Sequence, residues 1–451
     1  MDLKECKEEL LQFIEESPSA FHAVENLKKM AYDAGYTELK ETEEWQLSAG
    51  GRYFVTRNDS SIAAFSVPGG SETADAAAKK APDTAGEGIS EEDGTVCLIK
   101  GFHIVAAHSD SPSFKIKEKP EITVEGKYVK LNTERYGGMI MSTWFDRPLS
   151  VAGRIIVKQG EKIESRLVNV DRDLLVIPSV AIHMNRDANS GTEYNAQIDM
   201  LPLYGESVDE NSFMDSVAEA AGVEKEAILA HDLFLYVRDK GKRIGRNGEY
   251  ILSPRLDDLQ CAFSAMKAMT QVVPVSYINI CAVFDNEEVG SGTRQGADST
   301  FLADVLARIQ EAFGKNASWL RCKIADSLLI SADNAHAVHP NHPEKADLTN
   351  RPYLNGGIVI KYHGSQKYTT DALTAAAMKE LCREAGVPVQ TYTNRSDIAG
   401  GSTLGNISTA HVSVPSVDIG LPQLAMHSAV ETAGGRDTEY AVRMLSVFYG
   451  K

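Results

Sequence analysis

Residues 97–112 read CLIKGFHIVAAHSDSP, and this run indicates the fold class of the chain. From Cys97 to Ala107 it is almost continuously apolar, which is typical of a strand covered on both faces of a sheet. His108 and Asp110 follow directly. Because open α/β sheets bind ligands beyond the carboxyl ends of their strands, the run predicts a buried strand that brings polar side chains to a functional edge.

Further predicted strands alternate with predicted amphipathic helices toward both ends of the chain. The apolar patterns predict strands at 53–56, 62–67, 277–284, 328–332 and 412–419. They predict helices at 3–15, 20–34, 300–313, 370–385 and 438–449, the last with Asp437 as its N-terminal cap. This alternation is typical of a doubly wound α/β domain.

The middle of the chain has a different pattern. Between residues 117 and 248, short runs alternate apolar and polar residues, as in an antiparallel β domain with one solvated face. Residues 69–94 contain no aromatic residue, so we expect a mobile surface loop there. We therefore predict the α/β class, with a doubly wound mixed sheet made from residues 1–116 and 249–451 and interrupted by an inserted β-rich domain at 117–248.

Composition excludes several classes of protein. The 451 residues include 46 Lys and Arg against 63 Asp and Glu, and the formal net charge of −17 repels nucleic acid and anionic membranes. The six cysteines form no CxxC pair, and the N-terminus has no apolar leader. No run approaches the roughly 18 apolar residues that span a bilayer. We expect a cytoplasmic protein with neither nucleic acid nor membrane as a partner.

Residues able to bind metals follow the predicted strands at five places. Taken singly, each has an ordinary explanation, since a histidine or a carboxylate pair after a strand is often only hydrogen-bonded or solvated. Taken together, two imidazoles and several carboxylates at one edge of a sheet match the ligands that bind a pair of divalent metals. The candidates are His108, Asp257, Glu287, Glu288, Asp333 and His427.

Two local spacings suggest supporting roles in catalysis. Asp110 lies two residues after His108, on the same side of an extended chain. We expect its carboxylate to accept the N–H of the imidazole nitrogen that does not bind metal, which fixes the orientation of the ring. Glu287 and Glu288 are adjacent, and adjacent side chains diverge. One of them can therefore bind metal while the other accepts a proton.

The motifs around these candidates, in their order along the chain, resemble those of the aspartyl aminopeptidase family of dinuclear zinc aminopeptidases. The resemblance runs from residues 19–24 to the last predicted helix, includes 136–138 and 144–149, and leaves out 69–94. The motifs that carry it are His-Ser-Asp-Ser-Pro (108–112), Ser-Pro-Arg-Leu-Asp-Asp (253–258), Asp-Asn-Glu-Glu-Val-Gly-Ser (285–291), Ser-Ala-Asp-x-Ala-His (331–336) and Pro-Gln-Leu-Ala-Met-His-Ser (422–428).

This resemblance implies a role for each candidate. It implies two zinc ions bridged by Asp257, although ligand sets so rich in oxygen also accept Mn, Co or Fe. Glu287 would be the general base. The remaining ligands would be His108 and Asp333 at the first metal, and Glu288 and His427 at the second.

The resemblance also implies a substrate and an assembly. The expected reaction removes the N-terminal residue of short peptides with a preference for Asp or Glu. Lys361 would contact the acidic side chain, and Lys367 is the next candidate. The family places a histidine from the β domain of a neighbouring subunit over the active site, and His183 matches it. We therefore expect a homo-oligomer, in this family a dodecamer built from dimers, with the β-rich domain serving as dimerisation domain and lid.

Other interpretations stay open at this point. A broad or neutral-preferring aminopeptidase, or a dipeptidase, would use the same dinuclear chemistry. His183 could be an ordinary surface histidine. A non-catalytic assembly or cargo-binding protein could retain the fold, although a purely structural metal site has no use for an uncoordinated glutamate beside a ligand.

Overall fold

A nine-stranded mixed sheet joins both ends of the chain in the computed structural model, which describes residues 3–69, 99–209, 211–401 and 403–451. Its strand order is β1-β2-β3-β13-β4-β14-β18-β16-β17. The central strand β4 (Gly101–His108) runs parallel to its neighbours β13 (Tyr277–Phe284) and β14 (Leu328–Ala332). The other strands are β1 (Thr37–Glu38), β2 (Arg52–Arg57), β3 (Ser61–Ser66), β16 (Ile358–Tyr362), β17 (Val389–Thr393) and β18 (Ser416–Gly420).

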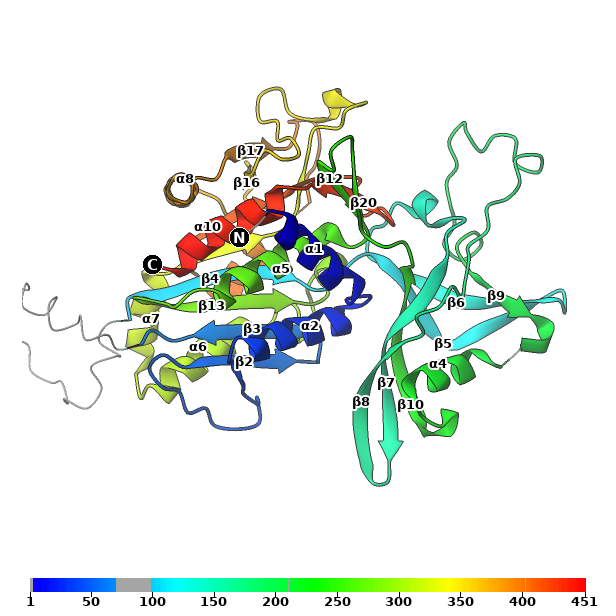
Figure 1. Cartoon of the computed structure of the whole chain (residues 1–451), viewed down its shortest axis with the longest axis horizontal. Coiled ribbons are helices and arrows are strands. Elements are labelled where there is room, and N and C mark those ends of the chain that lie inside the picture. The colour runs from blue at the N-terminus through cyan, green and yellow to red at the C-terminus, as the bar shows by residue number, and fades with distance from the viewer. Residues whose placement is uncertain (1–2, 70–98, 210, 402) are drawn as a thin grey trace, which may run out of the picture.

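Helices cover both faces of this sheet (Figure 1). Alternate residues of β4 point to opposite faces, so Val105 packs in one hydrophobic core and Ile104 in the other. Every residue of β4 is buried, as its apolar sequence predicts. The first core lies under α1 (Leu3–Glu15), α2 (Ala20–Asp33), α5 (Leu256–Thr270), α8 (Ala372–Ala385) and α10 (Asp437–Tyr449), and the second under α6 (Phe301–Ala312), α7 (Ala317–Ala325) and α9 (Leu404–His411).

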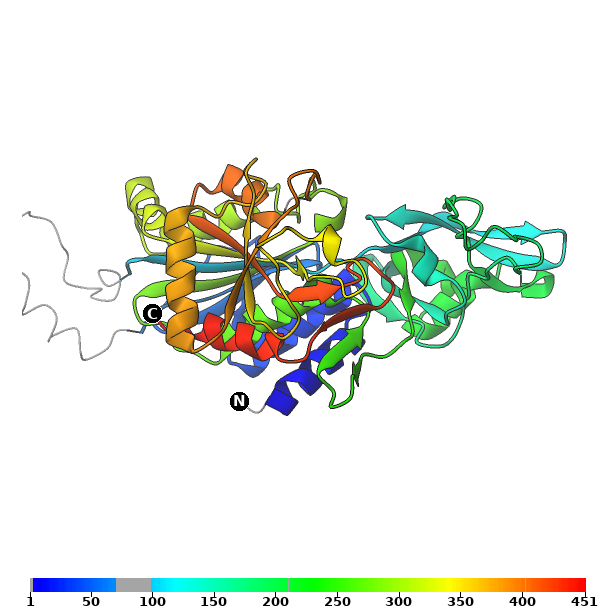
Figure 2. The same cartoon turned by 90° about the horizontal axis from the view of Figure 1, so that it is seen from above.

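A six-stranded antiparallel sheet forms a second lobe beside the first (Figure 2). Its order is β8-β7-β10-β5-β6-β9, and α4 (Phe213–Ala221) adds Phe213 and Val217 to its core. The predicted fold class, a mixed α/β sheet interrupted by a β-rich insertion, is therefore confirmed. The strands are β5 (Ser113–Val124), β6 (Tyr128–Tyr136), β7 (Leu149–Gln159), β8 (Lys162–Asn169), β9 (Leu203–Glu206) and β10 (Ile228–Val237).

A small five-stranded sheet, which the sequence patterns do not predict, connects distant segments of the first lobe. Its order is β11-β12-β20-β19-β15. These strands are two to four residues long, so they offer little periodicity to detect. Their bounds are β11 (Lys242–Ile244), β12 (Tyr250–Ser253), β15 (Ala335–His336), β19 (Pro422–Leu424) and β20 (Glu431–Gly434).

Two of the other differences from the sequence-based expectations concern helices. Helix α5 is not predicted because it is buried on nearly every side and has no polar face to mark a helical period. Asp437 is not the cap of α10, since Arg436 occupies that position and the Asp437 carboxylate accepts the N–H groups of Asn355 and Gly357. The loop expected at 69–94 lies outside the described residues beyond Gly69. Within the described ranges, no helix is both long and apolar enough to cross a bilayer.

Candidate metal centre

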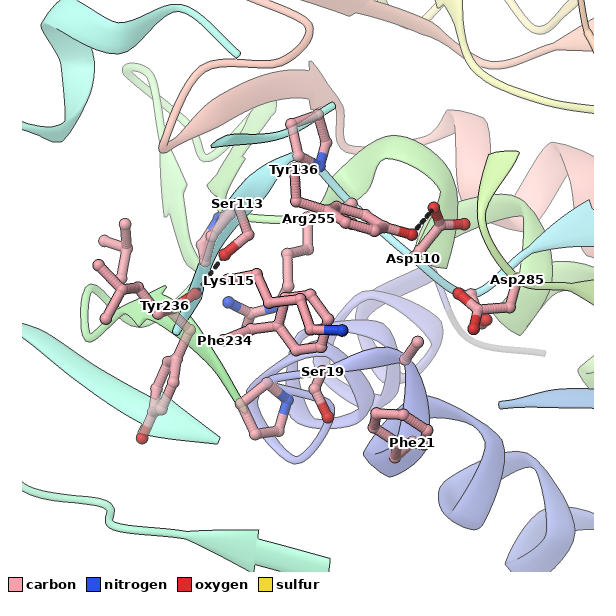
Figure 3. A pocket seen from close by; sticks show the side chains of 18 of the residues that line it. Ser19, Phe21, Asp110, Ser113, Lys115, Tyr136, Phe234, Tyr236, Arg255 and Asp285 are labelled. Atoms are coloured by element: carbon pink, nitrogen blue, oxygen red, sulfur yellow. Dashed lines mark hydrogen bonds between the residues drawn. The ribbon is translucent and has the colours of Figure 1, made fainter. Parts of the chain in front are cut away.

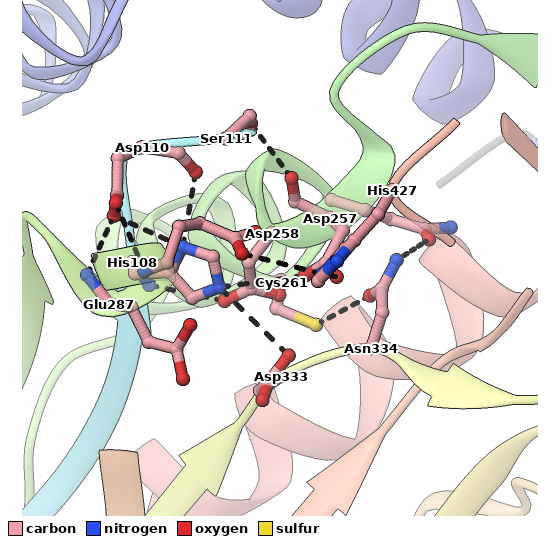
Figure 4. Close-up of polar contacts among 12 residues, drawn as sticks. His108, Asp110, Ser111, Asp257, Asp258, Cys261, Glu287, Asp333, Asn334 and His427 are labelled. Atoms are coloured by element: carbon pink, nitrogen blue, oxygen red, sulfur yellow. Dashed lines mark hydrogen bonds and ion pairs between the residues drawn. The ribbon is translucent and has the colours of Figure 1, made fainter. Parts of the chain in front are cut away.

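The carboxyl ends of three neighbouring strands bring four of the candidates together, and Figure 4 labels three of them, His108, Glu287 and Asp333. His108 is the last residue of β4, and Asp333 directly follows β14. Glu287 and Glu288 form a 3₁₀ turn shortly after β13. Because β13, β4 and β14 are adjacent and parallel, their carboxyl ends meet at one edge of the sheet, as predicted.

The small sheet supplies the other two candidates. Asp257 follows β12 at the start of α5, where its φ of −81° and ψ of 110° are not helical. His427 lies in the turn between β19 and β20 and has a φ of 65°, which is uncommon for a residue with a side chain. β12 and β19 both pair with β20, so the two side chains approach one another across it.

The ligand atoms fall into two groups that share Asp257. Nε2 of His108 lies 3.5 Å from Oδ1 of Asp257 and 4.0 Å from Oδ1 of Asp333. Nε2 of His427 lies 3.4 Å from Oδ2 of Asp257 and 3.4 Å from Oε2 of Glu288. Within each group the ligand atoms lie within 4.8 Å of one another. The two oxygens of Asp257 thus face different groups, as those of a bridging carboxylate would.

Glu287 lies beside the same cluster. Its carboxylate, with His108 and Glu288, forms a third group whose ligand atoms lie within 4.8 Å of one another. Figure 4 shows the Glu287 and Asp333 carboxylates on the same side of the His108 ring. This position suits either a proton acceptor next to the metals or a further ligand.

Both imidazoles are oriented in the same way. Nδ1 of His108 lies 3.1 Å from the backbone oxygen of Asp110, and Nδ1 of His427 lies 2.9 Å from that of Gly138. A backbone carbonyl holds a proton on Nδ1 and leaves Nε2 free to bind metal. In both residues, Nε2 is the nitrogen that faces Asp257.

The carboxylate of Asp110 does not act quite as the spacing predicts. Its Oδ1 is 3.4 Å from Nδ1 of His108, farther than the backbone oxygen of the same residue. It accepts instead the backbone N–H groups of Glu287 and Glu288, at 3.1 and 3.2 Å, and the hydroxyl of Tyr136 at 2.7 Å. Burial and the neighbouring carboxylates raise the pKa of Tyr136, so its hydroxyl stays protonated and donates. Asp110 therefore supports the Glu287–Glu288 turn more directly than it supports the histidine.

The electrostatics of the cluster favour the binding of cations. Burial, and then the charge of Asp257, raises the pKa of Glu288 well above its usual value. Burial opposes protonation of the histidines, yet nearby carboxylates raise the pKa of His427 to about 10 and that of His108 well above its usual value. These side chains therefore retain protons that divalent cations would displace on binding.

Two buried oxygens without hydrogen-bond partners among the described residues also favour a bound cation. Oδ1 of Asp257 and Oε1 of Glu288 are buried and accept no hydrogen bond from any residue in the described ranges. A buried carboxylate oxygen without a partner is costly, and coordination of a cation would relieve the cost. Two imidazoles with carboxylates are a ligand set that suits zinc. The residues present therefore fit a zinc centre.

Two supporting carboxylates, Asp258 and Glu431, are not among the candidates from the sequence. Asp258 accepts the backbone N–H of His108 at Oδ2, at 3.1 Å, and thereby fixes the end of β4. Asp257 and Asp258 are adjacent, so the sequence could have suggested that the two carboxylates have different roles, as it does for Glu287 and Glu288. Glu431 contacts the backbones of two candidates, and no sequence pattern marks it.

The candidate substrate residues lie in different environments. Lys361 is 2% exposed, and its Nζ lies 3.0 Å from the backbone oxygen of Asn334 and 3.5 Å from Oδ2 of Asp333. Lys367 donates to the backbone oxygen of Gly400 at 2.7 Å. His183 lies on an exposed part of the segment between β8 and β9, and it is not among the residues grouped around Asp257.

A cavity of about 280 Å³ lies behind the cluster, at the junction of the two lobes (Figure 3). Its walls include Phe21 at the start of α2, Lys115 of β5 and Phe234 of β10. Of the six candidates, only Asp257 lines it. The cavity therefore borders the supporting carboxylates Asp110 and Glu431, not the side on which the candidate ligands converge.

Comparison with known proteins identifies the family. Residues 13–78 and 93–449 match the family model described as aminopeptidase I zinc metalloprotease (M18). The chain belongs to peptidase family M18. It is 45% identical over 451 residues to "Probable M18 family aminopeptidase 2" of Clostridium acetobutylicum, and the match covers 99% of this chain and 98% of that protein.

Solved structures of similar proteins agree with this assignment. A chain in the cryo-EM structure of the Ape4 and Nbr1 complex superposes with a TM-score of 0.90 at 35% identity, covering 99% of this chain and 86% of that one. A chain of the S. cerevesiae mApe1 dodecamer superposes with a TM-score of 0.80 at 27% identity, covering 98% of this chain and 96% of that one. The predicted zinc aminopeptidase family is confirmed at the level of M18, while the preference for N-terminal Asp or Glu stays a prediction.

Proposed function

We propose that this M18 aminopeptidase removes the N-terminal residue of short peptides at a dinuclear zinc centre bridged by Asp257. The observation that carries the proposal is the division of the Asp257 carboxylate. Its Oδ1 lies 3.5 Å from Nε2 of His108, and its Oδ2 lies 3.4 Å from Nε2 of His427. Asp333 would complete the first zinc position, and Glu288 the second.

Glu287 is proposed as the general base. Zinc supplies Lewis acidity, which lowers the pKa of water and polarises a peptide carbonyl. The Glu287 carboxylate accepts the proton of the attacking water and later delivers it to the leaving amine. Its backbone N–H donates to Oδ1 of Asp110 at 3.1 Å, which holds the glutamate at the end of β13.

A matched pair of substitutions tests this division of roles. Glu287→Gln should lower kcat by about 10²–10⁴-fold, because an amide cannot accept the proton, and should leave two zinc ions bound. Glu288→Gln, the same change one residue later, should instead reduce the zinc content measured by elemental analysis. If Glu287→Gln loses zinc and Glu288→Gln retains it, the two roles are exchanged. Near-normal turnover by zinc-replete Glu287→Gln would remove Glu287 from the mechanism.

The preference for an acidic N-terminal residue is a narrower proposal. Lys361 supports it, because this lysine places a buried cation at the edge of the ligand cluster, over the ring of Tyr368 at 5.3 Å. A charge-assisted hydrogen bond in such a site contributes about 1.5–3 kcal/mol. Rates on matched substrates with N-terminal Glu, Leu or Lys test it. A higher kcat/KM for Leu would instead support a broad or neutral-preferring aminopeptidase of the same dinuclear type.

A homo-oligomer is the corresponding proposal for assembly. The similar S. cerevesiae mApe1 forms a dodecamer, and we propose the β-rich domain at 117–248 as dimerisation domain and lid of the catalytic domain at 1–116 and 249–451. The exposed apolar side chains of Ile182 and Met184 flank His183, which suits a surface covered by a neighbour. A monomeric mass by light scattering at micromolar concentration, with full activity, would contradict this proposal.

A further inference from the structure

Glu431 is a buried carboxylate that the proposed mechanism does not use. It is the first residue of β20, it pairs across the small sheet with Ser253 of β12, and it is 2% exposed. This pairing places it next to the segment that leads into Asp257, and it lies only four residues after His427. One side chain therefore lies between two candidate ligands that are far apart in the sequence.

The two oxygens of Glu431 hold these two ligands by their backbones. Oε1 accepts the N–H of His427 at 2.7 Å, and Oε2 accepts the N–H of Asp257 at 3.0 Å. Both distances are those of well-formed hydrogen bonds. The side chains of the same two residues approach each other to 3.4 Å on the other side. The Glu431 carboxylate thus links the backbones of the two candidate ligands.

Glu431 accepts these two N–H groups at positions where the backbone is irregular. Asp257 has non-helical dihedral angles although it lies at the start of α5, and His427 has a positive φ in a turn between two short strands. Neither N–H takes part in a strand ladder or in a regular helix. The positive φ of His427 is uncommon for a residue with a side chain, and such a conformation persists only when its surroundings hold it there.

We propose that Glu431 is a positioning residue that sets the separation of Asp257 and His427, and thereby the affinity of the second zinc position. The inference rests on the proposed function, since it presupposes two zinc ions. Glu431 would hold the backbone N–H groups of Asp257 and His427, just as Asp110 holds those of Glu287 and Glu288. Residues that orient metal ligands typically affect metal affinity by about 10–100-fold.

Glu431→Gln separates this role from simple space filling. The amide oxygen of glutamine can replace only one carboxylate oxygen, and the amide NH₂ group then faces the second N–H, so that two donors oppose each other. The backbone N–H of either Asp257 or His427 therefore loses its acceptor. We expect the second zinc dissociation constant to rise by about 10–100-fold in titrations of metal-free protein against a competing chelator. The first position, which shares only Asp257, should change less.

Asp437→Asn is a matched control. Asp437 is also fully buried, and its two oxygens also accept two backbone N–H groups, those of Asn355 at 2.7 Å and Gly357 at 3.0 Å. Those residues are not candidate ligands. Asp437→Asn should lower the melting temperature of the metal-free protein to a similar extent and leave both zinc dissociation constants unchanged.

The outcomes distinguish the possible failures. Wild-type zinc constants in Glu431→Gln, or equal loosening in Asp437→Asn, would overturn the inference. If Glu431→Gln does not fold, Glu431→Asp keeps the carboxyl group but is one methylene too short to reach both N–H groups, and the same rise is expected. If neither variant folds while Asp437→Asn does, Glu431 serves general stability and the inference is wrong. Fewer than two zinc ions in the wild-type protein would instead refute the proposed function.

Discussion

Replacing Asp110 by asparagine tests how the Glu287–Glu288 turn is held. The Asp110 carboxylate accepts the Glu287 N–H at Oδ1, and the Glu288 N–H and Tyr136 hydroxyl at Oδ2. Asparagine offers only one acceptor oxygen. The orientation that keeps two of the three bonds puts this oxygen at the Oδ2 position. The NH₂ group then faces the N–H of Glu287, so the loss falls on the proposed general base.

The size of the effect follows from this geometry. A fully buried N–H without an acceptor costs about 1–3 kcal/mol, and because the Glu287 bond is only partly buried we expect about 1 kcal/mol of stability to be lost. The backbone oxygen of Asp110, which faces Nδ1 of His108, is unchanged by the substitution. Zinc content should therefore stay at two per chain. Displacement of Glu287 should lower kcat by about 10–100-fold, or about 1.4–2.7 kcal/mol of activation free energy.

The assay combines zinc analysis, thermal unfolding and steady-state kinetics on Asp110→Asn and Tyr136→Phe. Tyr136→Phe removes the hydroxyl that donates to Asp110 and accepts the side-chain N–H of Asn286 at 2.8 Å. It leaves the Asp110 carboxylate to hold both backbone N–H groups, so its kcat should fall less than that of Asp110→Asn. The reasoning is refuted if Asp110→Asn turns over at the wild-type rate with two zinc ions bound. It is also refuted if Asp110→Asn loses zinc before it loses turnover.

Three further outcomes are expected. Asp257→Asn should lower zinc occupancy at both positions, since both groups of ligands share its carboxylate; a content of two ions per chain would contradict the bridge. Lys361→Met should lower kcat/KM on an N-terminal Glu substrate by about 10–100-fold. Zinc analysis must accompany this measurement because Nζ of Lys361 also lies 3.5 Å from Oδ2 of Asp333. An equal loss on a Leu substrate would show that Lys361 has a structural role and does not select the substrate. Mixed oligomers of His183→Ala and Glu287→Gln chains should regain part of the activity if His183 acts on a neighbouring subunit, and no recovery over the separate variants would place His183 outside the site.

By itself, the amino-acid sequence determined several strands of the central sheet and the ligand types at its edge. The apolar run before His108 predicted a strand covered on both faces, and β4 lies at the centre of the nine-stranded sheet. The predicted strands at 277–284 and 328–332 agree with β13 and β14. Such strands can be predicted from the sequence because burial on both faces requires a continuous run of apolar residues.

The convergence of Asp257 and His427 was decided by the tertiary structure alone. The strands that align them, β12, β19 and β20, are too short for a periodic signal. β12 pairs with β20 from a distant part of the chain, Asp257 and Glu431 being 174 residues apart. The same holds for the carboxylates of Asp110 and Glu431. Their partners are backbone N–H groups, which every residue except proline carries and which therefore leave no mark in a sequence. The sequence could name the chemical groups of this site, but only the pairing of distant backbones decides which oxygen faces which nitrogen.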